Sequence, residues 1–393
     1  MTKTPKLRFP GFTDAWEQRK LGEVAEVVGG GTPSTSIQDY WDGDIDWYSP
    51  AEIGNQIFLK GSQKKITELG IQSSSAKILP VGTVLFTSRA GIGNTAILTK
   101  EGATNQGFQS IVPNIGKLNS YFIFSRTDEL KKYGETQGAG STFVEVSGKQ
   151  MSKMPISLPP LPEQEAIGAF FRQLDELLTL HQRKLDEVKN LKKSLLQKMF
   201  PKNGERIPEV RFPEFTAAWE QDKVSKLMVR VSEISDTTDI PTIEYEDVVS
   251  GSGSLIPGYE RKETNKKGII FQNGDVLFGK LRPYLKNWLL AEFDGKAVGD
   301  WWVLHSEKLN SEFQYSLIQN SQFQEVANIS TGTKMPRSDW KLVSEVKLFF
   351  PTLPEQEAIG AFFRQLDELL TLHQRKLEHL QSLKRALLQQ MFI

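Results

Sequence analysis

The longest regular pattern in the chain is a helical stripe of apolar residues that follows Pro162. Apolar residues recur at three- and four-residue spacing from Ile167 to Met199, and charged residues occupy the other positions. Pro is tolerated in the first turn of a helix, where acidic side chains such as Glu163 and Glu165 also favour the positive end of the dipole. The pattern predicts one helix of about 38 residues, roughly 57 Å long, ending before the Pro-Lys-Asn-Gly segment at 201–204.

The same stripe occurs twice. Residues 161–185 and 353–377 both read LPEQEAIGAFFRQLDELLTLHQRKL, and a shorter block, RFPxFTxAWEQ, occupies 8–18 and 211–221. The chain is therefore an internal duplication. A recent duplication that is still drifting is one reading, but drift should erode all segments alike. The segments between the repeats differ much more, which favours helices that meet the same surroundings twice and intervening domains that meet different ones.

Two equal amphipathic helices in one chain are expected to pack on each other as an antiparallel coiled coil, which buries both stripes. The alternative is that each helix packs only on its neighbouring domain. The stripe also includes Val188, Leu191 and Leu195. The residues expected to pack at the coiled coil or against partners are Ile167, Phe170, Phe171, Leu174, Leu178 and Leu185, with Ile359, Phe362, Phe363, Leu366, Leu370 and Leu377 in the second copy.

The intervening segments carry short β-type runs separated by Gly, Pro, Asn and Asp, which predicts α+β domains of one fold. VGTVLFTSR at 81–89 matches NGDVLFGKLR at 273–282. The predicted layout is a globular domain at 1–160, a helix at 161–200, a second globular domain at 201–352 and a second helix at 353–393. The fold class is α+β with a pseudo-twofold internal duplication.

Composition excludes several classes of protein. The 393 residues contain no Cys, which rules out a disulfide framework, a cysteine zinc site and a cysteine nucleophile. No run of about 18 apolar residues is present and the first residues lack an apolar core, so we expect no membrane span, no signal peptide and a cytoplasmic location. Lys plus Arg equals Asp plus Glu at 48 each, which argues against a wholly basic surface.

The balance of charge is nevertheless uneven within the second domain. Residues 228–260 hold seven acidic residues and one Arg, whereas 261–286 hold seven basic residues and two acidic ones. The basic stretch interleaves cations with aromatic residues in a turn-rich setting, a composition typical of phosphate contacts and base readout. The candidate DNA-contacting residues there are Lys280, Arg282, Tyr284, Lys286, Lys334 and Arg337.

The first domain offers amides and hydroxyls instead. Side-chain amides pair well with adenine edges in the major groove. The candidates are Ser88, Arg89, Asn94, Asn105, Gln106 and Gln109.

No catalytic site is expected in this chain. The sequence has no GxxxxGK[ST] phosphate loop and no amino-methyltransferase motif, and its four His residues lack metal-ligand spacing. Asp339 with Glu345 and Lys347 mimics a nuclease motif only weakly, because its six-residue gap is short. We therefore expect no catalytic, cofactor-binding or metal-binding residues.

The order of the repeats, the LPEQEAI helix starts, GDVLF followed by LRPYL, and GTKMPRSDW together resemble the specificity subunit of Type I restriction–modification enzymes over essentially the whole chain. The resemblance implies two target recognition domains, each reading half of a bipartite duplex DNA target. It also implies that two modification subunits and then restriction subunits bind this chain. Catalysis, S-adenosylmethionine, ATP and magnesium would belong to those partners.

A different class of function also fits part of the pattern. A duplicated coiled-coil adaptor without any DNA role would explain the identical helices and the zero net charge. It leaves the basic and amide-rich loops unexplained. Salt-dependent binding to duplex DNA separates the two hypotheses.

Overall fold

The computed structural model describes residues 4–54, 56–89, 91–138, 145–202, 204–259, 265–329 and 335–392. The chain forms two compact units. Unit 1 comprises the chain up to Thr179 together with the segment from Glu378 onward, and unit 2 is Leu180–Leu377. Each unit therefore contains half of each long helix, so the helices are parts of both units and not separate domains.

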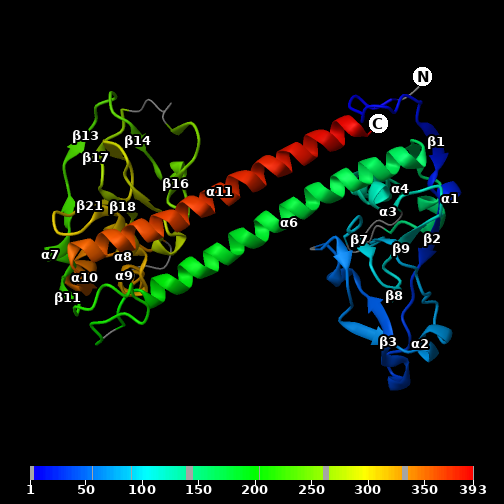
Figure 1. The fold of residues 1–393 in the computed structure, drawn as a ribbon, viewed down its shortest axis with the longest axis horizontal. Helices are drawn as coiled ribbons and strands as arrows, with labels where there is room; N and C mark the ends of the chain where they lie inside the picture. Colours follow the sequence, from blue (N-terminus) through cyan, green and yellow to red (C-terminus); the bar gives the residue numbers. More distant parts are fainter. Residues whose placement is uncertain are drawn as a thin grey trace. The chain divides into compact units, whose positions relative to one another are not determined.

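The two predicted helices are present, as α6 (Leu161–Lys198) and α11 (Leu353–Met391). In unit 1, Phe171 of α6 packs near Phe392 while Asp175 pairs with Lys384 of α11. In unit 2, His181 contacts His373 while Lys192 pairs with Asp367. Residue numbers rise along one helix as they fall along the other, so the helices are antiparallel within each unit, side by side as Figure 1 shows. The predicted antiparallel pairing is confirmed.

The first turns of α6 also pack on the globular part of unit 1, and those of α11 pack on the globular part of unit 2. Ile167, Phe171 and Leu174 belong to the core of unit 1 together with Met391 of α11. The equivalent residues of α11 belong to the core of unit 2 with Met199. The alternative that each helix packs only on its neighbouring domain is wrong, because the first turns of each helix pack both on that domain and on the end of the other helix.

Unit 1 is built from short strands and helices. Its strands are β1 (Glu17–Lys20), β2 (Ala25–Gly29), β3 (Trp41–Tyr48), β4 (Phe58–Leu59), β5 (Lys64–Ile66), β6 (Val84–Phe86), β7 (Thr95–Leu98), β8 (Gly102–Thr104), β9 (Gln109–Pro113) and β10 (Pro155–Leu158). Its short helices are α1 (Leu21–Val24), α2 (Glu68–Gln72), α3 (Ser120–Phe124), α4 (Thr127–Gln137) and α5 (Gly148–Met151). The strands form sheets in the orders β2-β9-β6-β7-β4, β5-β3-β8 and β1-β10.

Unit 2 repeats much of this plan. Its strands are β11 (Glu220–Lys223), β12 (Val229–Val231), β13 (Ile234–Ser235), β14 (Thr242–Ile243), β15 (Val248–Val249), β16 (Ser254–Leu255), β17 (Gly268–Phe271), β18 (Val276–Gly279), β19 (Trp288–Leu290), β20 (Gly295–Ala297), β21 (Trp301–His305) and β22 (Lys347–Phe350). Its short helices are α7 (Val224–Leu227), α8 (Ser311–Gln319), α9 (Ser321–Ala327) and α10 (Trp340–Glu345). The sheets are β12-β21-β18-β19, β13-β17-β20-β14, β11-β22 and β15-β16.

The strand orders show that the two units share one topology. The order β2-β9-β6-β7 in unit 1 corresponds to β12-β21-β18-β19 in unit 2, and the pair β1-β10 corresponds to β11-β22. The parallel pair β3-β8 likewise corresponds to the parallel pair β14-β20. The α+β fold class and the internal duplication are therefore confirmed.

The repeated sequence at the helix starts fixes the start of α6 to unit 1 and the start of α11 to unit 2. Glu163 is buried and accepts two hydrogen bonds from Arg8, both at 2.7 Å, and Glu355 does the same with Arg211. Gln164 likewise accepts from the backbone N–H of residue 119, which precedes α3. Buried charges require such partners, so these residue types follow from the fold.

The glycine of each helix start permits a close approach. A Cβ on Gly168 would lie 2.7 Å from Asn119 Oδ1, and a Cβ on Gly360 would lie 2.9 Å from Asn310 Oδ1. These two Asn residues cap α3 and α8 respectively. Only glycine fits where a helix crosses so close to another helix start.

Candidate nucleic-acid interface

In unit 2, two loops that lie far apart in the sequence form one surface. The loop after β18 and the segment 335–339 are joined by a β-bridge between Leu281 and Arg337. Arg282 N also donates to Pro336 O at 2.7 Å, and Ser338 N donates to Lys280 O at 2.9 Å. The structure thereby brings together five predicted residues: Lys280, Arg282, Tyr284, Lys286 and Arg337. Lys334 lies outside the described residues.

The tip of this surface has an unusual backbone. Arg282 and Lys286 have φ values of 50° and 58°, in the left-handed region, on either side of a 3₁₀ turn at Pro283–Leu285. Non-glycine residues in sparsely populated backbone regions cost on the order of 1–3 kcal/mol each. The side chains of Arg282, Tyr284 and Lys286 are all exposed. Strain of this kind gathers at functional sites.

The cations of this surface fall into two groups. Arg337 and Lys280 both pair with Asp300, at 2.9 Å and 3.5 Å. The hydrogen bond from Arg337 holds the pKa of Asp300 below its ordinary value. In the described part of the chain, Arg282 and Lys286 make no ion pair. These two are therefore the cations most available to phosphate.

Unit 1 has a corresponding surface at the loop 87–94 after β6. The backbone N–H of Ser88 donates to Gly107 O at 2.8 Å, and Val146 N donates to Ser88 O at 3.1 Å. These bonds bring the loop beside the segment that carries Asn105 and Gln106. Asn94 and Gln106 are exposed, whereas Arg89, Asn105 and Gln109 are half-buried.

Two of the predicted residues of unit 1 have side chains that lie within the loop structure: Ser88 is buried, and Asn105 closes a turn. Ser88 is completely buried, so its side chain is not available for a direct base contact. Its hydroxyl has no hydrogen-bond partner among the described residues. Asn105 Oδ1 accepts from Gly107 N at 2.8 Å, which closes a tight turn.

A polar loop that the sequence analysis missed lies beside these amides. The segment Gly29–Ser36 reads GGGTPSTS, and the hydroxyl of Thr32 donates to the Gln106 side chain. The indoles of Trp47 and Trp41 donate to Gly31 O and Ser34 O at 2.9 Å and 3.0 Å. A Cβ on Gly30 would clash with the backbone at 104–105. The run of glycines followed by hydroxyl residues was the available signal.

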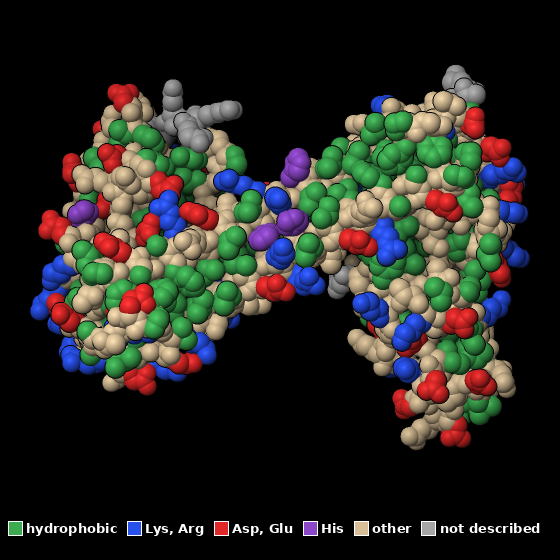
Figure 2. Space-filling view, in the orientation of Figure 1, with side chains coloured by type: hydrophobic (Ala, Val, Ile, Leu, Met, Phe, Trp, Pro, Cys, Tyr) green, Lys and Arg blue, Asp and Glu red, His purple; other side chains and the backbone are tan. Residues whose placement is uncertain are grey.

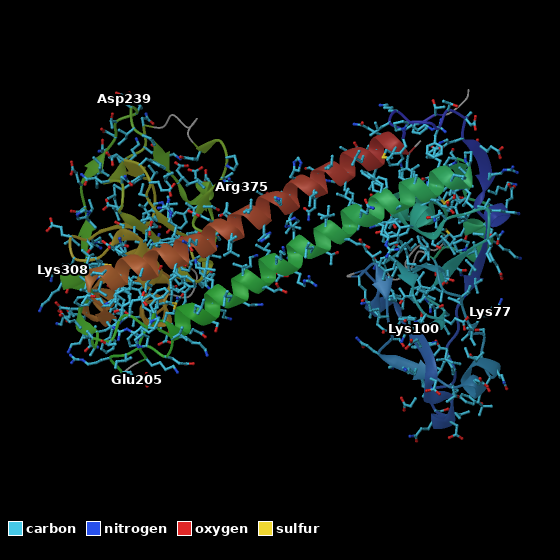
Figure 3. All side chains as sticks on the ribbon, in the orientation of Figure 1. Lys77, Lys100, Glu205, Asp239, Lys308 and Arg375 are labelled. Atoms are coloured by element: carbon cyan, nitrogen blue, oxygen red, sulfur yellow. The ribbon has the colours of Figure 1, made fainter. Side chains whose placement is uncertain are left out.

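The equivalent segment of unit 2 has the opposite character. The chain after β12 carries Glu233, Asp236 and Asp239, and Asp239 stands at the outer end of its loop in Figure 3. Acidic side chains repel phosphate, so this segment is unsuited to the role that a hydroxyl-rich loop can fill.

The helix residues predicted to pack divide into two classes. Ile167, Phe171, Leu174 and Leu185 are buried, as are their equivalents Ile359, Phe363, Leu366 and Leu377. Phe170, Leu178, Phe362 and Leu370 are half-buried.

Other leucines of the helices face solvent at equivalent positions of both copies of the repeat. Leu191, which the stripe had placed inside, is exposed, and so are Leu383 in the second copy and the equivalent pair Leu177 and Leu369. The prediction that Leu191 packs in the stripe is wrong, because other residues of the same turns face the partner helix. The exposed leucines thus occur in both units, as Leu177 and Leu383 in unit 1 and as Leu369 and Leu191 in unit 2.

Unit 2 also contains a symmetric histidine contact between the helices. His181 Nδ1 and His373 Nδ1, which occupy the same position of the repeat, lie 3.0 Å apart. Burial, and then the charges of His373, Lys376 and Lys184, lower the pKa of His181. The contact favours neutral rings, because two cations at this distance repel.

The described residues hold no group of three or more His, Cys, Asp or Glu side chains that could bind a metal. Within the weak nuclease mimic, Asp339 caps α10 through Lys341 N and Glu345 pairs with Lys223, so both have structural roles. None of the described helices is long and apolar enough to span a membrane. Acidic and basic side chains are interspersed over the visible face of each unit (Figure 2).

The sequence of the chain is similar to those of one protein family. The family model for the Type I restriction modification DNA specificity domain matches residues 13–190 and 223–382. The MjaIX specificity subunit of Methanocaldococcus jannaschii is 26% identical over 95% of this chain and 91% of its own length. The EcoDI specificity subunit of Escherichia coli is 24% identical over 89% of this chain and 81% of its own length.

Two solved structures share the fold. The S subunit of a Type I system from M. genitalium has a TM-score of 0.66 at 13% identity, covering 100% of this chain and 99% of that chain. A chain from a study of complex assembly and conformational transition of the type I R-M system has a TM-score of 0.51 at 17% identity, covering 97% and 98%.

Proposed function

The chain belongs to the family of Type I restriction–modification DNA specificity subunits, whose role is target recognition and not catalysis, and on that premise we propose that each unit reads one half of a bipartite duplex target. The observation that carries the proposal is that one topology is used twice with different loops. Unit 1 presents exposed amides and hydroxyls, and unit 2 presents exposed cations beside an aromatic ring. Two unlike surfaces on equivalent scaffolds suit two unlike half-sites.

The chemistry of each surface indicates what it reads. Exposed amides such as Asn94 and Gln106 can pair with adenine edges, and the hydroxyl-rich loop beside them can contact phosphate. In unit 2, Arg282 can pair with guanine or phosphate, while Lys286 supplies charge to the backbone. The acidic segment after β12 keeps the net charge of the unit low, so binding depends on these few cations.

The duplicated exposed leucines of the long helices support the partners that we propose. Unit 1 exposes Leu177 and Leu383, and unit 2 exposes the equivalent Leu369 and Leu191, so each of two copies of one modification subunit would meet the same exposed leucines. Restriction subunits would join the complex of this chain with its modification subunits. S-adenosylmethionine, ATP and magnesium would bind those partners in the cytoplasm, and this chain would supply the DNA contacts.

Methylation mapping tests the proposal. The chain should be expressed with its modification subunit in a host that lacks other adenine methyltransferases, and the modified adenines mapped by sequencing. We expect a single bipartite motif, and duplex binding whose affinity falls steeply with salt because phosphate contacts release counterions. A complex that assembles but methylates no motif and binds no duplex would instead support the adaptor without a DNA role.

A further inference from the structure

The tip of the unit 2 surface exposes apolar side chains that the proposed half-site contacts do not explain. Tyr284 and Leu285 are 56% and 42% exposed in the 3₁₀ turn, and Met335, on the loop bonded to it, is 57% exposed. Single exposed apolar residues are common, but here they occupy two loops that share backbone hydrogen bonds. Together they form an exposed apolar tip that is open to a binding partner.

Hydrogen bonds from neighbouring segments of unit 2 fix the backbone of the tip. Tyr245 Oη donates to Asp300 O at 2.6 Å and accepts from Leu281 N at 3.1 Å. Gly251 N donates to Lys286 O at 2.9 Å, and Pro283 is buried under the turn. The left-handed residues Arg282 and Lys286 are thus fixed by the surroundings, and the turn between them projects outward.

The charge around the tip indicates what covers it. Residues 276–291 contain Lys280, Arg282 and Lys286 and no acidic residue, and the nearby Asp300 is already paired. An apolar tip with a cation on each side matches a duplex, because the cations can hold phosphates while the apolar groups enter the base stack. A protein partner would instead have to offer an apolar pocket ringed by acids.

We propose that Tyr284 and Leu285 form a wedge that inserts between base pairs of the unit 2 half-site, unstacking one step and bending the duplex. This proposal rests on the proposed function of unit 2. The described residues of the corresponding loop of unit 1, 87–89 and 91–94, include no exposed large apolar side chain, since Ile92 between Gly91 and Gly93 is buried. The distortion is therefore confined to one half of the target, and it favours a readily unstacked pyrimidine–purine step there.

The test uses the complete complex of this chain with its modification subunits and a duplex that carries the mapped motif. 2-Aminopurine replaces one base at a time through both half-sites, and its fluorescence reports unstacking. Away from the two methylated adenines, which the modification subunits themselves extrude from the stack, we expect a rise of several-fold at one step of a single half-site with the native chain. The double variant Tyr284→Ala, Leu285→Ala should lose that rise. The double variant should bind the duplex about tenfold more weakly.

Matched variants separate the wedge from other roles. Tyr284→Phe should keep the fluorescence rise, since the wedge requires the ring and not the hydroxyl. Ile256→Ala removes another exposed apolar side chain of unit 2 and should have no effect. The melting temperature of each variant complex should match that of the native complex, because the changed side chains are exposed.

Three outcomes would overturn the wedge. Tight binding of the native complex with no change in fluorescence at any position would remove the wedge and leave the proposed function intact. Loss of modification-subunit binding by the double variant, with the fluorescence rise retained, would make the tip a protein contact. A native complex that binds no duplex would overturn both proposals together.

Discussion

The two units use the same helix start for the same purpose and different loops for different purposes. In each unit a buried Glu receives two hydrogen bonds from an Arg of the RFP block, at Arg8–Glu163 and Arg211–Glu355. In each unit a Lys of one long helix pairs with an Asp of the other, at Lys384–Asp175 and Lys192–Asp367. The loop after β6 has a single charged residue, Arg89, and the positive φ values of its described residues fall on glycines, whereas the loop after β18 has three cations and positive φ values at Arg282 and Lys286.

The difference shows what kept the repeated segments identical. Much of the LPEQEAIGAFF sequence is buried against its own unit, where the glutamate, the glutamine, the glycine and the apolar residues each make a specific contact. Identity over this stretch therefore reflects the requirements of the fold as well as those of a shared partner. The loops are free of such requirements and can diverge with the half-site.

Small asymmetries remain inside the shared framework. Trp219 Nε1 donates to Glu355 at 3.2 Å, whereas the indole of the equivalent Trp16 has no hydrogen-bond partner among the described residues. Asp175 also accepts from Tyr121 Oη at 2.9 Å, and Lys192 also donates to Gln319. These differences allow the two units to be compared by mutation.

The largest effect is expected at the buried glutamates. Glu163→Ala and Glu355→Ala each leave a half-buried Arg, 13% and 11% exposed, without its carboxylate, which lowers the free energy of unfolding by about 3–5 kcal/mol. Glu355→Ala should cost about 1 kcal/mol more, because Trp219 also loses its acceptor. Urea unfolding followed by tryptophan fluorescence measures both losses.

The control variants are Glu165→Ala and Glu357→Ala. These glutamates are exposed and lie two residues after Glu163 and Glu355, so their loss should change the free energy of unfolding by less than about 0.5 kcal/mol. Equal losses for the two buried glutamates would show that the bond from Trp219 contributes nothing. Losses as small as those of the controls would contradict the anchoring role of the helix start.

A smaller difference is expected at the lysines between the helices. Lys192→Met removes two hydrogen bonds and leaves Asp367, whose pKa burial already raises, without its cation. Lys384→Met removes one bond, and Asp175 keeps Tyr121. We expect losses of about 2–3 and about 1–2 kcal/mol respectively. The reverse order in urea unfolding would refute the comparison.

The smallest effect is a dependence on pH that belongs to unit 2. Because the pKa of His181 is lowered in the folded chain, the unfolded chain binds more protons below about pH 6.5. Burial of His181, and after it the contact with His373, favour the neutral ring, so their contribution to stability is fully present above that pH and is lost as the pH falls. His181→Asn should flatten part of the decline in the urea midpoint between pH 7.5 and 5.5.

The control for the histidine contact is His379→Asn, an exposed residue of α11. It should leave the pH dependence unchanged. A decline that is as steep in His181→Asn as in the native chain would show that carboxylates alone cause it.

The elements that could be predicted from the sequence are those whose signals are local or repeated. The ends of α6 and α11 follow from Pro162, the stripe and the 25-residue repeat, and the α+β units follow from short alternating runs. The basic loop of unit 2 was also visible, because its cations are adjacent in the sequence.

What escaped prediction depends on contacts between distant residues. The pairing of Lys280 and Arg337 with Asp300 follows from strand positions that no local pattern specifies. Ser88 looked like an exposed loop residue, but the backbone bonds to Gly107 and Val146 bury it. The Gly29–Ser36 loop was overlooked because glycines and hydroxyls carry no charge signal.

The central claim is that each unit reads its own half-site, and a chimera tests it most directly. Residues 25–155 of this chain should be replaced by the corresponding segment of a relative, and the methylated motif sequenced in cells that express the chimera with the modification subunit. The account predicts that one half of the motif changes while the other half stays the same. A motif in which both halves change would contradict it.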